Sequence, residues 1–532
     1  MRFSIVAATI AAVSMMSCAR GTPSEAPQSP GHDEHAQEMH DHDMEGHGVV
    51  EFPTSCNDAA QGAIEEGLAH LHHMMYEQSR PRFEAAAEAD AECAMAHWGI
   101  AMTSFQPLWH PTSDEGLERG KAAVATARAI GAPTAREEGY IAAAEAFFTD
   151  PEPPAADRPA DHEARVKSWT AAQRELHEAY PEDVDAAAFY GLSEVAYAMT
   201  QFSPTEERDF TRERRAGEMM QRYLEENPAH PGLFHYIIHA YDSPELAPEA
   251  AEVAEGYDEL APDVPHALHM PSHIFVRMGR WEETVEWNIR SAESALRHPV
   301  DGMTSLHYPH ALDYKMYGYL QLGDVAKARE TLEKVRAIEN PQPVFATAYG
   351  IAAPQARFFL EQGLWEEAAE LAPNEPAVLP WEDFPAAQAL FSYARGLGAA
   401  RSGALEQAEA ERAALNAHVA ALREAGDGYW ATTTEALSKA VAAWITYERG
   451  EAEEALALLS EAADLEESMD KHPITPGEVL PVRELFGDML ALEGRADEAI
   501  EAYQTSLQRT PNRRNAVAGV EGVGGEVADG GD

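Results

Sequence analysis

Apolar and polar positions along the chain follow a helical rather than a strand pattern. Alanine, leucine and glutamate dominate, and long alternating runs of β-branched or aromatic residues, which would predict strands, are missing. A glycine followed five residues later by an alanine recurs at Gly323, Gly363, Gly403, Gly450 and Gly494. This spacing is typical of a tight turn that starts a new helix. The pattern therefore predicts repeated pairs of short helices.

The stretch from Leu480 onward shows the repeat most completely. Within a unit of about 34 residues, small residues stand where two helices cross, an aromatic residue follows, and a proline stops the second helix: Gly487, Gly494, Ala499, Tyr503 and Pro511. Further copies begin near Pro231, Pro265 and Pro309. The pattern resembles the tetratricopeptide repeat over most of residues 56–515. The resemblance implies an all-α, right-handed superhelical solenoid of antiparallel helix pairs.

Composition divides the chain further. Prolines cluster in 151–160, and polar or glycine-rich stretches flank the repeats. The predicted parts are a lipoprotein signal peptide (1–17), a disordered histidine-rich tether (18–55), an N-terminal repeat block (56–150), a Pro-rich linker (151–160), the main array (161–515) and a disordered tail (516–532).

The first residues predict export. Arg2 precedes a short apolar run, too short to span a bilayer, and Met15-Met16-Ser17-Cys18 resembles a bacterial lipobox. This implies lipidation of Cys18 and, with Ala19 following, an outer-membrane lipoprotein facing the periplasm, or a periplasmic protein. The strings HYIIHAYD (235–242) and HALHMPSHIF (266–275) resemble a family of exported bacterial tetratricopeptide lipoproteins. That resemblance implies fold and export but no reaction.

Two cysteines remain once Cys18 is acylated. Cys56 and Cys93 lie 37 residues apart, close to one repeat, so stacked first helices would bring them together. In an oxidising compartment this spacing predicts a disulfide, with two buried free thiols as the alternative.

The acidity of the chain excludes one class of partner. The formal net charge is −52, and such a surface repels nucleic acid phosphates. We therefore expect no nucleic acid partner, and membrane attachment only through the lipid.

Histidines recur in register in the middle of the array. His235 and His239 are four residues apart, and His269 and His273 repeat the pair 34 residues later. Residues four apart share one helix face. By resemblance to the tetratricopeptide fold, these positions line the concave groove. The repeat that begins at Pro309 adds the groove candidates His310, Asp313 and Tyr317. Asp242 and His266 are further groove candidates in the repeats before it, and Trp98 and Met102 are predicted as an apolar floor of the groove.

Three interpretations of this cluster compete. Imidazoles with a carboxylate, from His235, His239, His269, His273, His310 and Asp313, could bind copper or zinc. The groove could instead hold a peptide or small anion through histidine donors. The histidines could also be packed residues that satisfy backbone groups. Pro271 bears on the geometry, because a helix that starts there would leave His266 and His269 on the preceding turn.

The N-terminal tract 31–48 is a second candidate for weak metal capture. Histidine-rich tracts are compositional metal-binding signals, and mixed histidine and methionine suits copper. A plain hydrophilic tether is the alternative. The candidate ligands are His32, His35, Met39, His40, His42, Met44 and His47.

The predicted function is an exported repeat scaffold that binds a protein or peptide partner, or another ligand, in its groove, with a histidine-based metal site. A periplasmic copper- or zinc-handling protein and a metal-dependent hydrolase are the alternatives. The chain has no HExxH, G-x-S-x-G or P-loop motif, so the sequence favours a non-enzymatic role.

Overall fold

The computed structural model describes residues 46–109, 111–201 and 208–529. Helices make up nearly all of the regular structure in these ranges, with isolated β-bridges at Val300–Met303 and Thr304–Pro341. The first helices are α1 (Asp58–His72), α2 (Tyr76–Ala89), α3 (Ala94–Met102), α4 (Asp114–Ile130), α5 (Ala135–Phe148), α6 (Arg158–Ala179), α7 (Val184–Thr200), α8 (Thr211–Glu226) and α9 (Pro231–Ala240).

The middle elements are η1 (Ala247–Ala250), α10 (Ala251–Glu255), α11 (Tyr257–Leu260), α12 (Pro265–His269), α13 (Pro271–Met278), α14 (Trp281–Arg297), α15 (His307–Leu322), α16 (Val325–Arg336), α17 (Phe345–Leu360) and α18 (Trp365–Ala369). The last are η2 (Trp381–Asp383), α19 (Pro385–Arg401), α20 (Leu405–Glu424), α21 (Gly428–Glu448), α22 (Ala452–Glu467), α23 (Val482–Leu492), α24 (Ala496–Arg509) and α25 (Arg514–Asp529).

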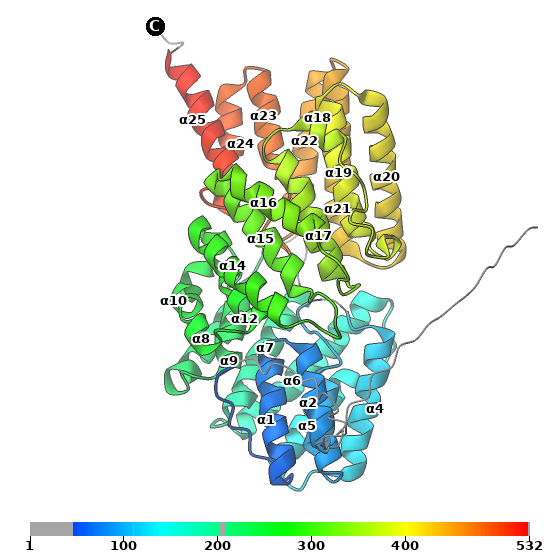
Figure 1. Cartoon of the computed structure of the whole chain (residues 1–532), viewed down its shortest axis with the longest axis vertical. Coiled ribbons are helices and arrows are strands. Elements are labelled where there is room, and N and C mark those ends of the chain that lie inside the picture. Colours follow the sequence, from blue (N-terminus) through cyan, green and yellow to red (C-terminus); the bar gives the residue numbers. More distant parts are fainter. Residues whose placement is uncertain (1–45, 110, 202–207, 530–532) are drawn as a thin grey trace, which may run out of the picture. The chain divides into compact units, whose positions relative to one another are not determined.

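Neighbouring helices in the sequence pack against one another along the chain. The pairs α1–α2, α3–α4, α5–α6, α19–α20, α21–α22 and α23–α24 are in contact, and most pairs also contact the next one. Figure 1 shows these helices lying alongside each other from the blue N-terminal end to the red C-terminal end. The predicted all-α array of helix pairs is confirmed.

The small residues of the repeat lie where the predicted crossing needs them. A Cβ added to Gly487 on α23 would come within 2.7 Å of the Tyr503 ring on α24, so only glycine lets these helices approach this closely. Gly494 joins the two helices with a φ of +72°, a left-handed conformation that glycine adopts without strain.

The hydrophobic core divides at a different place from the one that the sequence predicted. One buried cluster runs from Phe52 to Trp287 and a second from Ala292 to Ala516. Residues 151–157 only connect α5 to α6, and these two helices pack together. The Pro-rich stretch is therefore a loop inside one core, not a boundary between two blocks.

Both predicted disordered ends are shorter than expected where the structure describes them. The backbone N–H of Val49 donates to the carbonyl of Ala229 at 2.8 Å, and Phe52 is fully buried. At the other end, helix α25 continues to Asp529. The tether prediction was wrong for residues 46–55 and the tail prediction for 516–529, because contacts and helix formation that composition does not reveal order them.

Cys56 and Cys93 form a disulfide, with their Cα atoms 5.0 Å apart. Cys93 caps the N-terminus of α3, and Cys56 lies just before α1. The bond therefore joins the starts of two neighbouring helices.

Among the described helices, none is both long and apolar enough to cross a membrane.

Candidate metal centre

Seven histidines, buried or half-buried, meet in the middle of the array. They come from four helices, α9, α12, α13 and α15: His235, His239, His266, His269, His273, His307 and His310. Met270, between α12 and α13, keeps right-handed helical angles. The chain thus stays helical across Pro271, and His269 and His273 remain one turn apart on the same face.

The first group consists of His235, His239 and His266, whose potential ligand atoms all lie within 4.8 Å of one another. The Nδ1–H of His235 donates to the carbonyl oxygen of His72 at 2.6 Å, which leaves its Nε2 as a lone pair. The Nε2 of His239 lies 3.1 Å from that atom. Within the described part of the chain, neither ring nitrogen of His266 has a hydrogen-bond partner, although the residue is buried.

The second group consists of His269, His273 and His310, again with ligand atoms within 4.8 Å of one another. The Nδ1–H of His273 donates to the Asp242 carboxylate at 2.8 Å. The Nδ1–H of His269 donates to Oδ1 of Asn288 at 2.8 Å, and the amide of Asn288 is oriented by its own donation to the carbonyl of Thr284. Each Nε2 atom therefore carries a lone pair, yet the two Nε2 atoms lie only 3.0 Å apart.

Burial keeps these imidazoles neutral. It lowers the pKa of His235 to about 3 and that of His307 to about 4. Burial also holds the pKa values of His239, His266, His269 and His310 well below the ordinary histidine range, and their mutual repulsion adds to the effect. A neutral imidazole with a free lone pair is the form that binds a metal.

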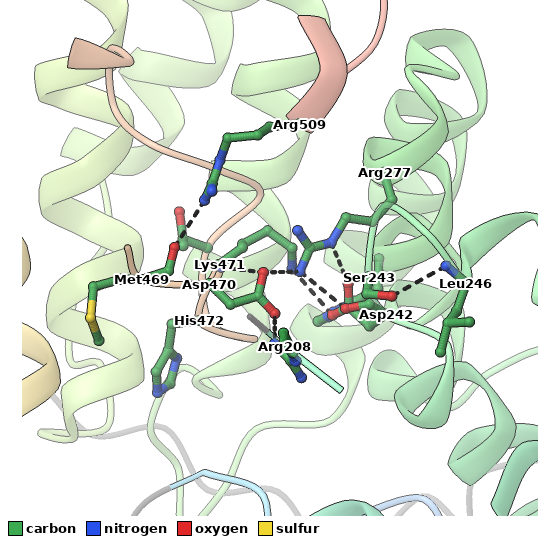
Figure 2. A network of polar contacts seen from close by, with 12 residues as sticks. Arg208, Asp242, Ser243, Leu246, Arg277, Met469, Asp470, Lys471, His472 and Arg509 are labelled. Carbon is green, nitrogen blue, oxygen red and sulfur yellow. Dashed lines mark hydrogen bonds and ion pairs between the residues drawn. The ribbon is translucent and has the colours of Figure 1, made fainter. Parts of the chain in front are cut away.

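Asp242 lies behind His273 in a network of charges. Its carboxylate accepts from Arg277 at 2.9 Å and Lys471 at 3.2 Å, as well as from His273. Burial opposes its ionisation, but the Lys471 and Arg277 charges outweigh burial and hold the pKa of the Asp242 carboxyl well below its usual range. Figure 2 shows Arg277 and Lys471 converging on Asp242, with Asp470 beside them. Such a carboxylate fixes the tautomer of the histidine in front of it.

Asp313 is not part of either histidine group. Its carboxylate faces the guanidinium of Arg357, with Nε 3.4 Å from Oδ1, and both side chains are fully buried. Burial raises the pKa of Asp313 to about 6, and Arg357 offsets this only in part. The prediction of Asp313 as a ligand was wrong, because Arg357, 44 residues away in sequence, lies against this face of α15.

Three other predicted groove residues lie elsewhere. The Tyr317 hydroxyl accepts from Arg513 at 2.8 Å, and its ring packs on Trp281. Trp98 is fully buried against Phe52, and Met102 belongs to the same core. The two residues predicted as an apolar floor of the groove therefore lie in the protein interior, because α3 packs against α1 and α5 rather than against α9.

A cavity of about 270 Å³ opens beside the histidine groups. Its histidine wall comprises His239, His266, His273, His307, His310 and His472. Its apolar wall includes Trp109, Leu306 and Phe345. Glu77 also lines it, and burial raises the pKa of that carboxyl.

The sequence pattern did not identify several of the residues that line the cavity or support the histidines. His307 precedes His310 by three positions on α15, a helical spacing that could have revealed it. Glu77, Trp109, Phe345 and Lys471 carry no such signal, because each reaches the site from a distant helix or loop.

A third group, His72, Asp185 and His230, lies deeper in the N-terminal core. The Asp185 Oδ1 lies 2.8 Å from His72 Nε2 and 3.1 Å from His230 Nε2. The other nitrogen of His72 meets the Tyr236 hydroxyl at 3.0 Å, and that of His230 accepts from the Leu233 N–H at 3.3 Å. Hydrogen bonds thus account for every imidazole nitrogen in this group, as expected of packed histidines.

Most of the N-terminal histidine-rich tract lies outside the described residues. Cys18 and the candidate ligands His32, His35, Met39, His40, His42 and Met44 lie outside the described residues. His47 is described, and its backbone carbonyl accepts from His73 Nε2 at 3.1 Å.

No protein-family model and no curated protein matches this chain. Solved structures with some similarity include yeast Tom70, with a TM-score of 0.32 and 11% identity, covering 89% of this chain and 97% of that chain. The anaphase-promoting complex assembly Cut9-Hcn1 has a TM-score of 0.29 and 9% identity, covering 88% and 96%. The P58(IPK) TPR domain has a TM-score of 0.22 and 11% identity, covering 89% and 99%.

Proposed function

We propose that this chain is an exported helical-repeat scaffold that holds a transition metal in its central histidine cluster. One observation carries the proposal: the Nε2 atoms of His269 and His273 lie 3.0 Å apart, while the Nδ1 atom of each ring faces an oxygen, of Asn288 and of Asp242, that accepts its proton. With both protons on Nδ1, each Nε2 carries a lone pair. Two lone pairs repel at that distance, and a cation bound by both nitrogens removes the repulsion. His310 supplies a third nitrogen.

The donors favour copper or zinc. All ligands in the two groups are imidazoles, which suit both metals, and at equal availability nitrogen sites hold Cu²⁺ more tightly than Zn²⁺. Asp242 behind His273 completes the histidine–carboxylate arrangement that tunes many metal sites. Metal handling is therefore the leading activity that we assign to the scaffold.

The cavity bears on the predicted groove partner. Its volume of about 270 Å³ suits one small molecule rather than a peptide segment. We therefore assign a small ligand to the centre and leave any protein partner to other surfaces of the array.

Hydrolysis is a second candidate, favoured by Glu77. This carboxyl lines the cavity that the histidines face, and burial raises its pKa. A raised pKa suits a group that exchanges protons with a metal-bound water. Turnover of an ester or phosphate substrate by the metal-loaded protein, lost in Glu77→Gln with metal content unchanged, would support hydrolysis.

Export is supported by the Cys56–Cys93 disulfide, since such bonds persist in oxidising compartments. The lipobox resemblance at Cys18 points the same way. Cell fractionation with Cys18→Ala tests the anchor: the native protein should partition with membranes and the variant should be released.

The metal proposal is tested on full-length protein purified without an affinity tag. We expect bound copper or zinc that survives gel filtration and is retained when residues 19–45 are deleted. His269→Ala combined with His273→Ala should lose the ion that these two nitrogens hold. His298→Ala is the matched control, because His298 pairs with Asp263 at 2.9 Å outside the cluster. Protein that takes up no metal, with unchanged stability in chelator, would overturn the proposal.

A further inference from the structure

We propose that the centre is binuclear, with one metal ion in each three-histidine group, and that both ions share one small-molecule site in the adjoining cavity. This inference rests on the metal-binding function proposed above and adds the number of ions and the class of ligand.

Each group is a complete three-nitrogen donor set. His235, His239 and His266 form the first. His269, His273 and His310 form the second. Three imidazoles with a fourth position left for water or substrate is the arrangement of catalytic rather than structural metal sites.

The two groups adjoin. The rings of His239 and His273 lie 6.0 Å apart between centroids, and those of His266 and His269 lie 6.2 Å apart. His239 and His266 of the first group line the cavity, and so do His273 and His310 of the second. The open positions of both ions would therefore face the same space.

Two buried histidines have ring nitrogens without a hydrogen-bond partner among the described residues, which supports a metal ion in the first group and a bound molecule in the cavity. Among the described residues, neither ring nitrogen of His266 has a hydrogen-bond partner, although the residue is only 4% exposed. The same holds for Nδ1 of His307, whose ring lies 5.2 Å from that of His266. Buried polar groups are almost always paired, so packing alone does not account for these two histidines.

The cavity walls indicate what the ions would bind. Trp109, Leu306 and Phe345 supply an apolar face that suits a single ring or a short aliphatic group. Two divalent ions held by neutral imidazoles would carry positive charge. Glu77 lines the cavity, but the Asp242 carboxylate behind His273 is already paired with Arg277 and Lys471. An anionic oxygen donor is therefore favoured on the metal side. A phenol or catechol that loses a proton on binding meets both demands.

Copper loading of the native protein tests the number of ions. We expect two Cu²⁺ per chain, with an electron paramagnetic resonance signal well below that of two isolated ions, because neighbouring ions couple. His266→Ala should retain one ion with a full signal, and His298→Ala, outside both groups, should retain two. One ion in the native protein overturns this inference and leaves the proposed function standing, whereas none overturns both.

The ligand class is tested with 4-nitrocatechol, whose absorption shifts on metal binding. We expect the copper-loaded native protein to bind it at one molecule per chain. Phe345→Ala should weaken binding about ten-fold through lost ring contact while keeping two ions. If 4-nitrocatechol does not bind the two-copper protein, or binds Phe345→Ala equally well, the assignment of the cavity is overturned.

Discussion

Single hydrogen bonds decide which nitrogen each central histidine offers to the centre. His273 and His269 each give their Nδ1–H to an oxygen, from Asp242 and Asn288 respectively. A proton held on Nδ1 leaves Nε2 as the lone pair. The side chains behind the histidines therefore set the donor geometry as firmly as the histidines themselves.

Asp242→Asn should weaken metal binding by about ten- to a hundred-fold, because it removes the carboxylate behind His273. Competition with a chromogenic chelator measures this. Asp263→Asn is the matched control, since it removes an equivalent carboxylate from His298. Equal affinities in the two variants would mean that Asp242 does not act through the metal site.

Asp313→Asn should leave metal content unchanged, since Asp313 faces Arg357. Its folded pKa of about 6 lies above the unfolded value near 3.8, so its contribution to stability is present at low pH and lost as pH rises through 6. Between pH 5 and 7 the free energy of unfolding of the variant should rise relative to native protein by about 1 kcal/mol. Urea unfolding at both pH values measures it, and loss of metal would restore Asp313 as a ligand.

At the scale of elements, helix continuity holds the ligands in register. Met270 stays helical between α12 and α13, so Pro271 starts α13 without turning the chain away. Proline is tolerated at the first positions of a helix because the missing N–H has no partner there. The histidine pair therefore spans two formally separate helices.

Replacing both Cys56 and Cys93 with serine should destabilise the fold by about 4 kcal/mol, because the bond closes a loop of 37 residues. The loss should be confined to unfolding of the N-terminal core, measured by hydrogen exchange in α1 and α3. Metal content should not change, because neither helix supplies a ligand to the two central groups. Equal protection of α1 and α3 with and without the bond would contradict this.

For the whole molecule, the buried histidines make the metal-free fold sensitive to acid. His72, His235 and His307 have pKa values lowered by burial to about 4, 3 and 4. Between these values and 6.5 the unfolded chain binds more protons than the folded chain. Stability therefore falls as pH falls.

Metal-free protein should lose about 4 kcal/mol of unfolding free energy per pH unit near pH 5 from these three groups alone. Denaturant unfolding at pH 7.5, 6 and 5 measures the slope. His72→Phe, which removes one titrating group, should make the slope shallower by about a third. A slope unchanged from pH 7.5 to 5 would show that these histidines are not neutral and buried.

The sequence by itself determined the helix pairs and the register of the histidines. Small residues at crossings, prolines at helix ends and the four-residue spacing of His235–His239 and His269–His273 are local features. Local spacing is enough to predict which side chains share a helix face. The metal ion and the exported location remain predictions.

The tertiary structure alone decided how the histidines divide into two groups and what lies behind them. Lys471 contacts Asp242 although the two are 229 positions apart in sequence, and Asp313 pairs with Arg357 instead of joining the histidine groups. The tertiary structure also places His266 in the first group and Glu77 in the wall of the cavity. Such contacts depend on the angle and depth at which distant helices pack, which follow from the whole set of core side chains rather than from any local pattern.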